Sequence, residues 1–329
     1  MKTYQIAGIG NAIVDVIATV DDHFLDHMGI HKGIMQLVER DRAETLYGAM
    51  KDRAQASGGS VANTLAGVGA LGLKAAFVGR VRDDALGRFY AADSERVGTH
   101  FANLPVADGE LPTSRSMIFV TPDGERSMNT YLGISAEISP DDVDAALMAD
   151  SAIVFLEGYL FDKDKGKAAF LKAARACRDA GGLAGIALSD PFCVDRHRDD
   201  FRALVAQDMD YVIGNEQEWV SLYQANDLDD ALVQAAAACD LVVCTRSGDP
   251  VRIIRNGEET EIPVKMVTPV DATGAGDQFA AGFLFGLANG ADMATAGRMG
   301  CIAAAEVISH IGARPKSDLL AIFRAEGLI

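Results

Sequence analysis

Short apolar segments alternate with longer amphipathic segments through the second half of the chain, and this alternation restricts the fold more than any other feature. The apolar segments have the length of strands, and the segments between them carry the apolar spacing of helices. Strands are expected at 152–157, 183–188, 211–213 and 241–245, and helices at 163–180, 199–206 and 216–223. Such alternation produces a parallel sheet that helices cover on both faces. The sequence therefore predicts a doubly wound, Rossmann-like α/β fold with a mostly parallel sheet.

One earlier helix is expected at about 140–149. Ser139 is a favourable N-cap, and Pro140 suits the first helical position, where the amide has no helical partner to lose. The two acids that follow, at 141 and 142, suit the positive end of the helix dipole.

Two segments lack this helical spacing and predict a small β-sheet. Residues 12–38 contain strand-like runs at 13–20 and 34–38, and residues 112–133 contain a hairpin whose turn is Pro122-Asp123-Gly124. We expect a small β-sheet lid formed by about 11–40 and 105–133, within a single domain that spans 1–329. A fixed rim of the main sheet is the alternative.

The formal net charge of −17 excludes some partners. Nucleic acid or an anionic membrane would be repelled, so the expected partners are small molecules, and the expected state is a monomer or homodimer. Five cysteines without a C-x-x-C pair indicate reduced thiols. The sequence lacks a charged-then-apolar leader and any unbroken apolar run of ~18 residues, which predicts a cytoplasmic protein that does not span a membrane.

The motif Asp271-Ala272-Thr273-Gly274-Ala275-Gly276-Asp277 carries the chemistry, and a helix pattern follows it directly. The small residues Gly274, Ala275 and Gly276 let a ligand approach the backbone. Their amides at a helix N-terminus attract an anion and can stabilise charge on a transferring phosphoryl group. Asp277 cannot favour an anion by its charge, so it fits a base that takes a proton from a hydroxyl. An ordinary helix cap is the alternative.

Two further motifs lie at expected helix starts. In the segment 57–63, Gly58 and Gly59 allow close approach of a polar ligand, and Asn63 can bind hydroxyls. Asn215 and Glu218 lie three residues apart at a helix start, so both can face one site. An amide and a carboxylate there suit a hydrated Mg²⁺. Structural helix caps explain either motif equally well.

Together the three motifs, in this order and spacing, resemble the ribokinase-like (PfkB) family of sugar and nucleoside kinases, and the resemblance covers nearly the whole chain. It implies an ATP-dependent kinase with Mg²⁺ as cofactor and a small-molecule acceptor. By this resemblance Asp277 is the catalytic base, and 274–276 form the anion hole. The remaining positions that it assigns are Asn215 and Glu218 for Mg²⁺ and phosphate; Thr245, Ser247 and Gly248 for ATP; and Asp15, Gly59, Asn63 and Arg126 for the acceptor or the phosphates.

The family usually has Thr where this chain has Ala272. This departure concerns the contacts of Asp271 and a monovalent-cation site, for K⁺, that the resemblance implies there.

Within the family the chain is most similar to adenosine kinases, because 188–192 resembles their L-S-A-P-F segment. Tyr159, Leu160 and Phe192 are the expected contacts of a purine, although ordinary core positions would explain them too. The expected reaction is phosphorylation of the 5′-hydroxyl of a ribonucleoside, adenosine. One alternative is a kinase of free ribose, fructose or a keto-deoxy sugar acid. Another is a non-catalytic nucleotide-binding regulatory protein.

Overall fold

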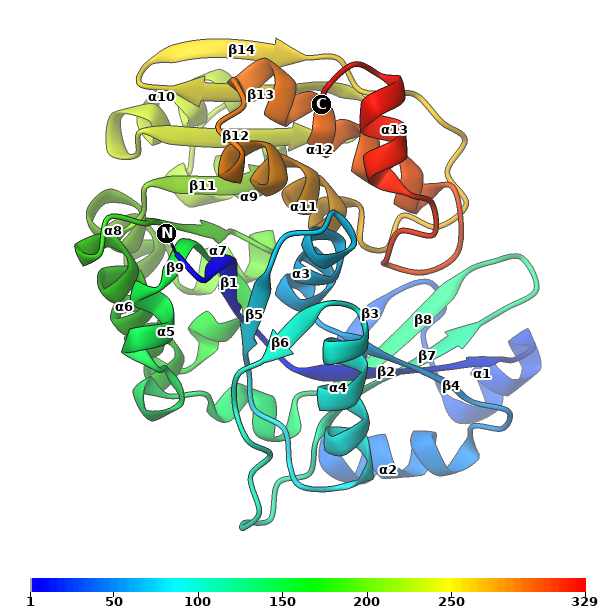
Figure 1. The fold of residues 1–329 in the computed structure, drawn as a ribbon. Helices are drawn as coiled ribbons and strands as arrows, with labels where there is room; N and C mark the ends of the chain where they lie inside the picture. Colours follow the sequence, from blue (N-terminus) through cyan, green and yellow to red (C-terminus); the bar gives the residue numbers. More distant parts are fainter. Residues whose placement is uncertain (1) are drawn as a thin grey trace.

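The computed structural model describes residues 2–329, which form a large and a small β-sheet with helices around them (Figure 1). The large sheet has nine strands in the order β14-β13-β12-β11-β10-β9-β1-β5-β6. Its strands are β1 Tyr4–Ile9, β5 Ala75–Val78, β6 Thr99–Phe101, β9 Ser151–Glu157, β10 Leu183–Ala187, β11 Tyr211–Asn215, β12 Leu241–Arg246, β13 Asp249–Arg255 and β14 Glu258–Ile262. All neighbours pair in parallel except β12–β13–β14, which are antiparallel at one edge. The predicted α/β class and mostly parallel sheet are confirmed.

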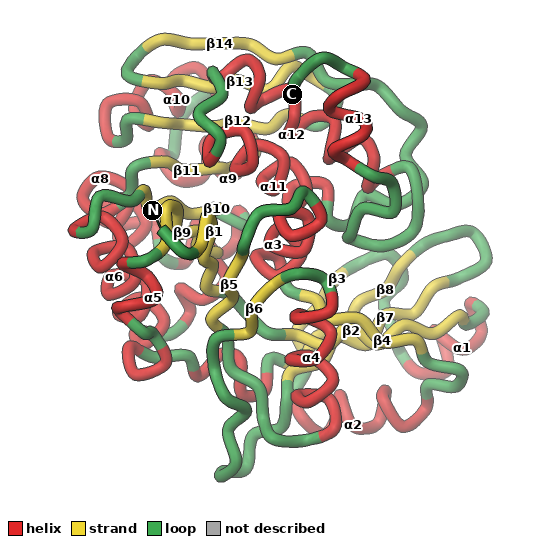
Figure 2. The backbone as a smooth tube through the Cα atoms, viewed as in Figure 1, coloured by secondary structure: helices red, strands yellow, loops and turns green. Residues whose placement is uncertain are grey.

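Helices cover both faces of this sheet (Figure 2). The α-helices are α1 Asp22–Met28, α2 Arg40–Ala49, α3 Ser60–Ala70, α4 Ala85–Arg96, α5 Ala145–Ala149, α6 Asp164–Asp179, α7 Pro191–Arg196, α8 Arg198–Asp208, α9 Glu216–Tyr223, α10 Leu228–Ala238, α11 Ala275–Ala288, α12 Met293–Ile308 and α13 Leu319–Ala325. Short 3₁₀ turns are η1 Gly133–Glu137, η2 Pro140–Asp142 and η3 Gly158–Asp162.

Alternate residues of each central strand enter two different cores, as the period of two requires. On β9, Phe155 belongs to the same core as the α11 side chains Phe279 and Phe283, whereas Val154 and Leu156 belong to the core on the opposite face, which includes side chains of α6 and α8. Burial on both faces explains why these strands read as continuous apolar runs in the sequence.

The prediction of one continuous helix at about 140–149 is wrong, because two separate elements occupy this segment. Ser139 and Asp142 form a capping box around the single turn η2, and Val143 then adopts an extended backbone. Asp144 caps the separate helix α5 by accepting from the Ala146 amide. Val143 is buried in the core at this break, so apolar packing and a second N-cap outweigh the helix start signals.

The small sheet has five strands in the order β3-β8-β7-β2-β4. Its strands are β2 Ile13–Thr19, β3 Met35–Leu37, β4 Ala54–Gly58, β7 Ser114–Val120 and β8 Arg126–Tyr131. Strand β4 lies outside both expected segments; it pairs antiparallel with β2 and forms one edge of the small sheet. One face, which includes Val16 and Phe119, packs on α1 and α2. Motion of this sheet as a lid stays a prediction.

No helix within residues 2–329 is both long enough and apolar enough to cross a bilayer.

Candidate active site

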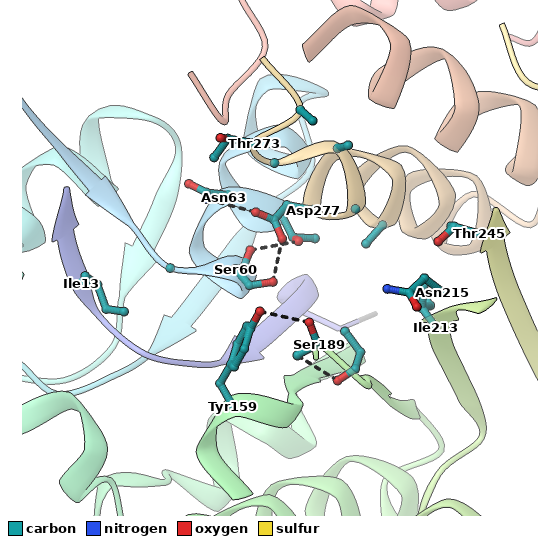
Figure 3. Close-up of a pocket in the computed structure, with 18 of the residues that line it drawn as sticks. Ile13, Ser60, Asn63, Tyr159, Ser189, Ile213, Asn215, Thr245, Thr273 and Asp277 are labelled. Atoms are coloured by element: carbon teal, nitrogen blue, oxygen red, sulfur yellow. Dashed lines mark hydrogen bonds between the residues drawn. The ribbon is translucent and has the colours of Figure 1, made fainter. Parts of the chain in front are cut away.

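A cavity of about 400 Å³ lies where the carboxyl ends of the large-sheet strands meet the small sheet. Carboxyl edges of parallel sheets are the usual position of ligand sites in open α/β folds. In Figure 3, Ile13 of β2 marks one end of this cavity, Asn215 and Thr245 mark the other, and Asp277 lies between them. The expected site residues in its lining are Asp15, Gly59, Asn63, Tyr159, Asn215, Glu218, Thr245, Gly274, Ala275, Gly276 and Asp277.

The backbone at the start of α11 lines the cavity, where the Ala275 amide already donates to the Ala272 carbonyl oxygen at 3.2 Å. Gly274 has a φ of 80°, and a Cβ there would lie 2.7 Å from Cα of Ala313. Only glycine therefore fits the turn that starts α11. Nothing lies within 4 Å of the position that a Cβ would take on Gly276, so this backbone faces open space. The first amides of a helix lack helical acceptors, so this turn can bind an anion.

Asp277 is held by two side chains from the first turn of α3. Ser60 Oγ donates to its Oδ1 at 2.6 Å, and Asn63 Nδ2 donates to its Oδ2 at 3.0 Å (Figure 3). Burial raises the pKa of Asp277 to about 6, against the two hydrogen bonds, which favour the ionised form. A carboxylate with a pKa near neutrality is a suitable general base.

Ser60 was not identified from the sequence, although its spacing of three from Asn63 places both side chains on one helix face. The turn before it depends on Gly59, whose φ is 104°. A Cβ on Gly59 would lie 2.1 Å from the Asn11 carbonyl oxygen.

Asp15 of β2 lies on the cavity face of the small sheet, beside Ser116 and Thr130. Burial raises its pKa to about 6, while the charges of Arg126 and Arg314 oppose the rise. A second carboxylate therefore borders the cavity on the side of the small sheet, where it can accept from hydroxyl groups.

Glu157, at the end of β9, is a second residue near the site that the sequence did not predict. Its Oε1 accepts from the Asn11 amide at 2.7 Å and from Asn11 Nδ2 at 2.9 Å, and its Oε2 accepts from the Val61 amide at 3.0 Å. Burial raises its pKa to about 7. The carboxylate thus links the β1–β2 junction to the start of α3, and a strand end rich in apolar residues gave no signal for this role.

Asn215 and Glu218 form a capping box at the start of α9 and also line the cavity. Asn215 Nδ2 donates to Glu218 Oε1 at 2.8 Å, and the Asn215 amide donates to Oε2 at 2.8 Å. Burial raises the pKa of Glu218 to about 7. A cation bound nearby would oppose this shift, because it stabilises the ionised carboxylate.

Asn215 and Glu218 can therefore cap α9 and also contribute to a ligand site. No cluster of three or more His, Cys, Asp or Glu ligands occurs within residues 2–329. These two side chains fit a Mg²⁺ whose other ligands are water and phosphate oxygens.

Five expected contacts do not line the cavity: Leu160, Phe192, Ser247, Gly248 and Arg126. Leu160 is only 2% exposed, because η3 directs it into the core beside Phe170. Phe192 is 71% exposed on α7. Ser247 and Gly248 form the turn between β12 and β13, beyond the lining residue Thr245.

Arg126, expected over the phosphates, is instead paired with Asp271. Its guanidinium is therefore already occupied by a carboxylate, and Arg126 is absent from the cavity lining.

A model of the pfkB family carbohydrate kinases matches residues 6–319. The chain belongs to this family. Among solved structures, a probable sugar kinase from Rhizobium etli CFN 42 is 43% identical, with a TM-score of 0.91, and the match covers 100% of each chain. Adenosine kinase from Sinorhizobium meliloti is 45% identical, with a TM-score of 0.89 over 98% of this chain and 99% of that chain. A 5-dehydro-2-deoxygluconokinase from Shouchella clausii is 27% identical over 77% of this chain and 80% of its own length.

As a PfkB kinase, the protein is an ATP-dependent phosphotransferase with an alcohol group as acceptor, as the sequence predicted. The ribokinase-like architecture is confirmed as well. The non-catalytic alternative has no support in these comparisons. The relatives carry both nucleoside-kinase and sugar-kinase names, so they leave the acceptor open.

Proposed function

We propose that this PfkB kinase transfers the γ-phosphoryl group of ATP to the 5′-hydroxyl of adenosine, with Asp277 as the catalytic base. The observation that carries this proposal is the pairing of a polar and an apolar wall on the small sheet. Asp15 and Thr130 supply oxygens to the cavity, and Ile13 and Met128 line the same cavity with apolar groups. A ribose with an attached base matches both walls.

The apolar wall extends beyond the cavity onto β3. Met35 pairs with Met128 in register, so both side chains lie on the same face of the small sheet. Met35 is 45% exposed and its neighbour on this face, Leu37, is 57% exposed. A purine seated on Ile13 and Met128 would cover part of this apolar surface. This position replaces the expected contacts with Leu160 and Phe192.

The ribose is proposed to lie between Asp15 and Asn63. Asp15 accepts hydrogen bonds from the 2′- and 3′-hydroxyls, and Gly59 lets the sugar approach the backbone. This orientation directs the 5′-hydroxyl toward Asp277. The adenosine kinase from Sinorhizobium meliloti, at 45% identity, supports the same acceptor.

ATP is proposed to occupy the opposite end of the cavity, toward Asn215 and Thr245. Its γ-phosphate then faces the amides of 274–276. Asn215 and Glu218 would hold Mg²⁺ through water, and the ion would supply positive charge that neutralises the phosphates. Asp277 takes the proton of the acceptor hydroxyl as the hydroxyl oxygen attacks the γ-phosphorus in line. The bond from the γ-phosphorus to the bridging oxygen breaks, ADP leaves, and the 274–276 amides stabilise the charge on the transferring group.

A free sugar is the second candidate acceptor. Ser116 and Thr130 hydrogen-bond to each other at 2.8 Å and add hydroxyls to the cavity wall, which suits a more polar acceptor. The probable sugar kinase from Rhizobium etli and the 5-dehydro-2-deoxygluconokinase support this alternative. The apolar surface of Ile13, Met128 and Met35 favours the nucleoside.

The product of the reaction tests the proposal. The enzyme is incubated with adenosine and ATP·Mg²⁺, and the products are separated by chromatography beside authentic 5′-AMP. We expect 5′-AMP and ADP in equal amounts. The matched control is 5′-deoxyadenosine, which should bind competitively with adenosine and give no phosphorylated product. Phosphorylation of 5′-deoxyadenosine, or failure of adenosine to react, would contradict the proposal.

A further inference from the structure

Arg126 and Asp271 form a buried ion pair between the small sheet and the loop that precedes α11. Nη1 of Arg126, on β8, donates to Oδ2 of Asp271, and the two residues are 145 positions apart in the chain. Asp271 lies three residues before Gly274, the first residue of the anion-binding turn. The pair therefore ties the small sheet to the turn that receives the phosphoryl group.

The Asp271 carboxylate also holds the loop in shape. Its Oδ2 accepts from the Gly312 amide at 2.9 Å, and its Oδ1 accepts from the Thr273 amide at 3.0 Å. Burial disfavours ionisation, but these hydrogen bonds and the Arg126 charge together hold the pKa of Asp271 below its usual range. The carboxylate is therefore ionised at neutral pH and needs a compensating positive charge.

The monovalent cation that the family resemblance implies beside Asp271 does not fit this arrangement. A carboxylate offers about four acceptor positions, and Arg126, Thr273 and Gly312 already use three of them. The guanidinium neutralises the carboxylate, so a cation would gain little electrostatic energy. The methyl group of Ala272 supplies no oxygen ligand, unlike the threonine usual at this position.

We propose that the Arg126 guanidinium takes the place of a monovalent cation at Asp271, so that this kinase does not require K⁺. Arg126 is then a positioning residue: it fixes the anion-binding turn through Asp271. The ion pair adjoins the phosphoryl-transfer centre, so this role of Arg126 is the same whichever acceptor the enzyme prefers.

The first test compares wild-type enzyme in potassium chloride and choline chloride at equal ionic strength, with the acceptor that reacts best. We expect kcat values that agree within about twofold and a melting temperature that does not depend on K⁺, because a cation that has no site cannot stabilise the folded state. A kcat that falls about tenfold or more in choline, or a melting temperature that rises with K⁺ concentration, would overturn the proposal.

The second test uses Arg126→Ala, which leaves the Asp271 charge buried and unpaired. We expect kcat/KM at least about tenfold lower in choline, with partial recovery in K⁺ or in guanidinium at concentrations too low to unfold the protein. Recovery should disappear in the double variant Arg126→Ala, Asp271→Asn. If Arg126→Ala lost activity equally in choline, K⁺ and guanidinium, the proposed role of Arg126 would be wrong.

A matched control is Arg115→Ala. Arg115 is also buried in the small sheet, but its guanidinium lies 4.7 Å from the Tyr47 ring centroid. Its loss can destabilise the sheet without exposing Asp271. Recovery of this variant by K⁺ or guanidinium would show a general salt effect and would contradict the proposal.

Discussion

Ser60 Oγ on α3 lies 2.6 Å from Asp277 Oδ1 on α11, and this contact joins two helix N-termini that are 217 residues apart in the chain. Because Asn63 donates to the other oxygen at 3.0 Å, one turn of α3 fixes the orientation of the whole carboxylate. Asp277 and the anion-binding turn can therefore keep their positions relative to the acceptor site only while α3 and α11 stay packed together.

Replacement of Asp277 by Asn preserves shape and removes the proton acceptor. We expect kcat to fall by roughly 10²–10⁴, with little change in ATP binding, because the 274–276 amides remain. Single-turnover kinetics and calorimetric ATP titration measure the two effects separately. If the variant kept a kcat within about threefold of wild type, Asp277 would be only a helix residue and not the base.

Removal of the Ser60 hydroxyl should shift the pH profile. The hydrogen bond from Ser60 favours ionised Asp277, so Ser60→Ala should raise a pKa that is already about 6. Since the base must be ionised, the acid limb of the kcat profile moves to higher pH, and activity near pH 6 suffers more than activity near pH 8. Ser116→Ala, which removes a cavity hydroxyl bonded to Thr130, is the control and should not move the limb. An unmoved or downward-shifted limb in Ser60→Ala would contradict this role.

Gly59→Ala should damage both stability and catalysis. Its φ of 104° is strained for alanine, and the new Cβ would lie 2.1 Å from the Asn11 carbonyl oxygen, so the start of α3 must move. Gly257→Ala is the control, because Gly257 also has a positive φ, of 82°, but has nothing within 4 Å of the Cβ position.

We expect Gly257→Ala to lower the free energy of unfolding by about 1–2 kcal/mol with kcat unchanged. Gly59→Ala should cost more stability and also lower kcat. Denaturant titration and steady-state kinetics test the pair, and equal behaviour of the two variants would show that the Asn11 contact is unimportant.

Glu157 should make folding stability depend on pH. Its folded-state pKa, raised to about 7, exceeds its ordinary value of 4.5, so the folded state binds more protons between these values. The contribution of Glu157 to stability is therefore greatest below about pH 4.5 and falls as pH rises toward 7, by at most about 1.4 kcal/mol per pH unit.

Glu157→Gln should flatten the stability profile between pH 5 and 7, measured by urea unfolding. Replacement of the exposed Glu258 by Gln is the control and should leave the slope as in wild type. An equally steep slope in Glu157→Gln would refute the assignment.

The parts of the site that could be predicted from the sequence are those formed by residues close together in the chain. The turn at 274–276 and the box of Asn215 and Glu218 depend on neighbouring residues, so their sequence motifs locate them. The contacts of Ser60 with Asp277 and of Arg126 with Asp271 depend on packing between distant segments, which a single sequence does not specify.

Side-chain direction at strand ends was the least predictable feature. Leu160 and Phe192 follow β9 and β10, where purine contacts were expected, but the turn η3 buries one and helix α7 exposes the other. The apolar wall instead comes from Ile13 and Met128 of the small sheet, whose orientation depends on strand register.

The acceptor preference tests the proposed function most directly. The measurement is kcat/KM for adenosine, inosine, guanosine, ribose and fructose, by coupled detection of ADP release. An adenine that covers about 100 Å² of apolar surface on Ile13 and Met128 would gain about 2–3 kcal/mol, which corresponds to a roughly 30–150-fold preference for adenosine over ribose. A higher kcat/KM for inosine or guanosine than for adenosine would support the purine site but assign it a different base. A free sugar that reacts better than every nucleoside would contradict the proposed function and establish a sugar kinase in its place.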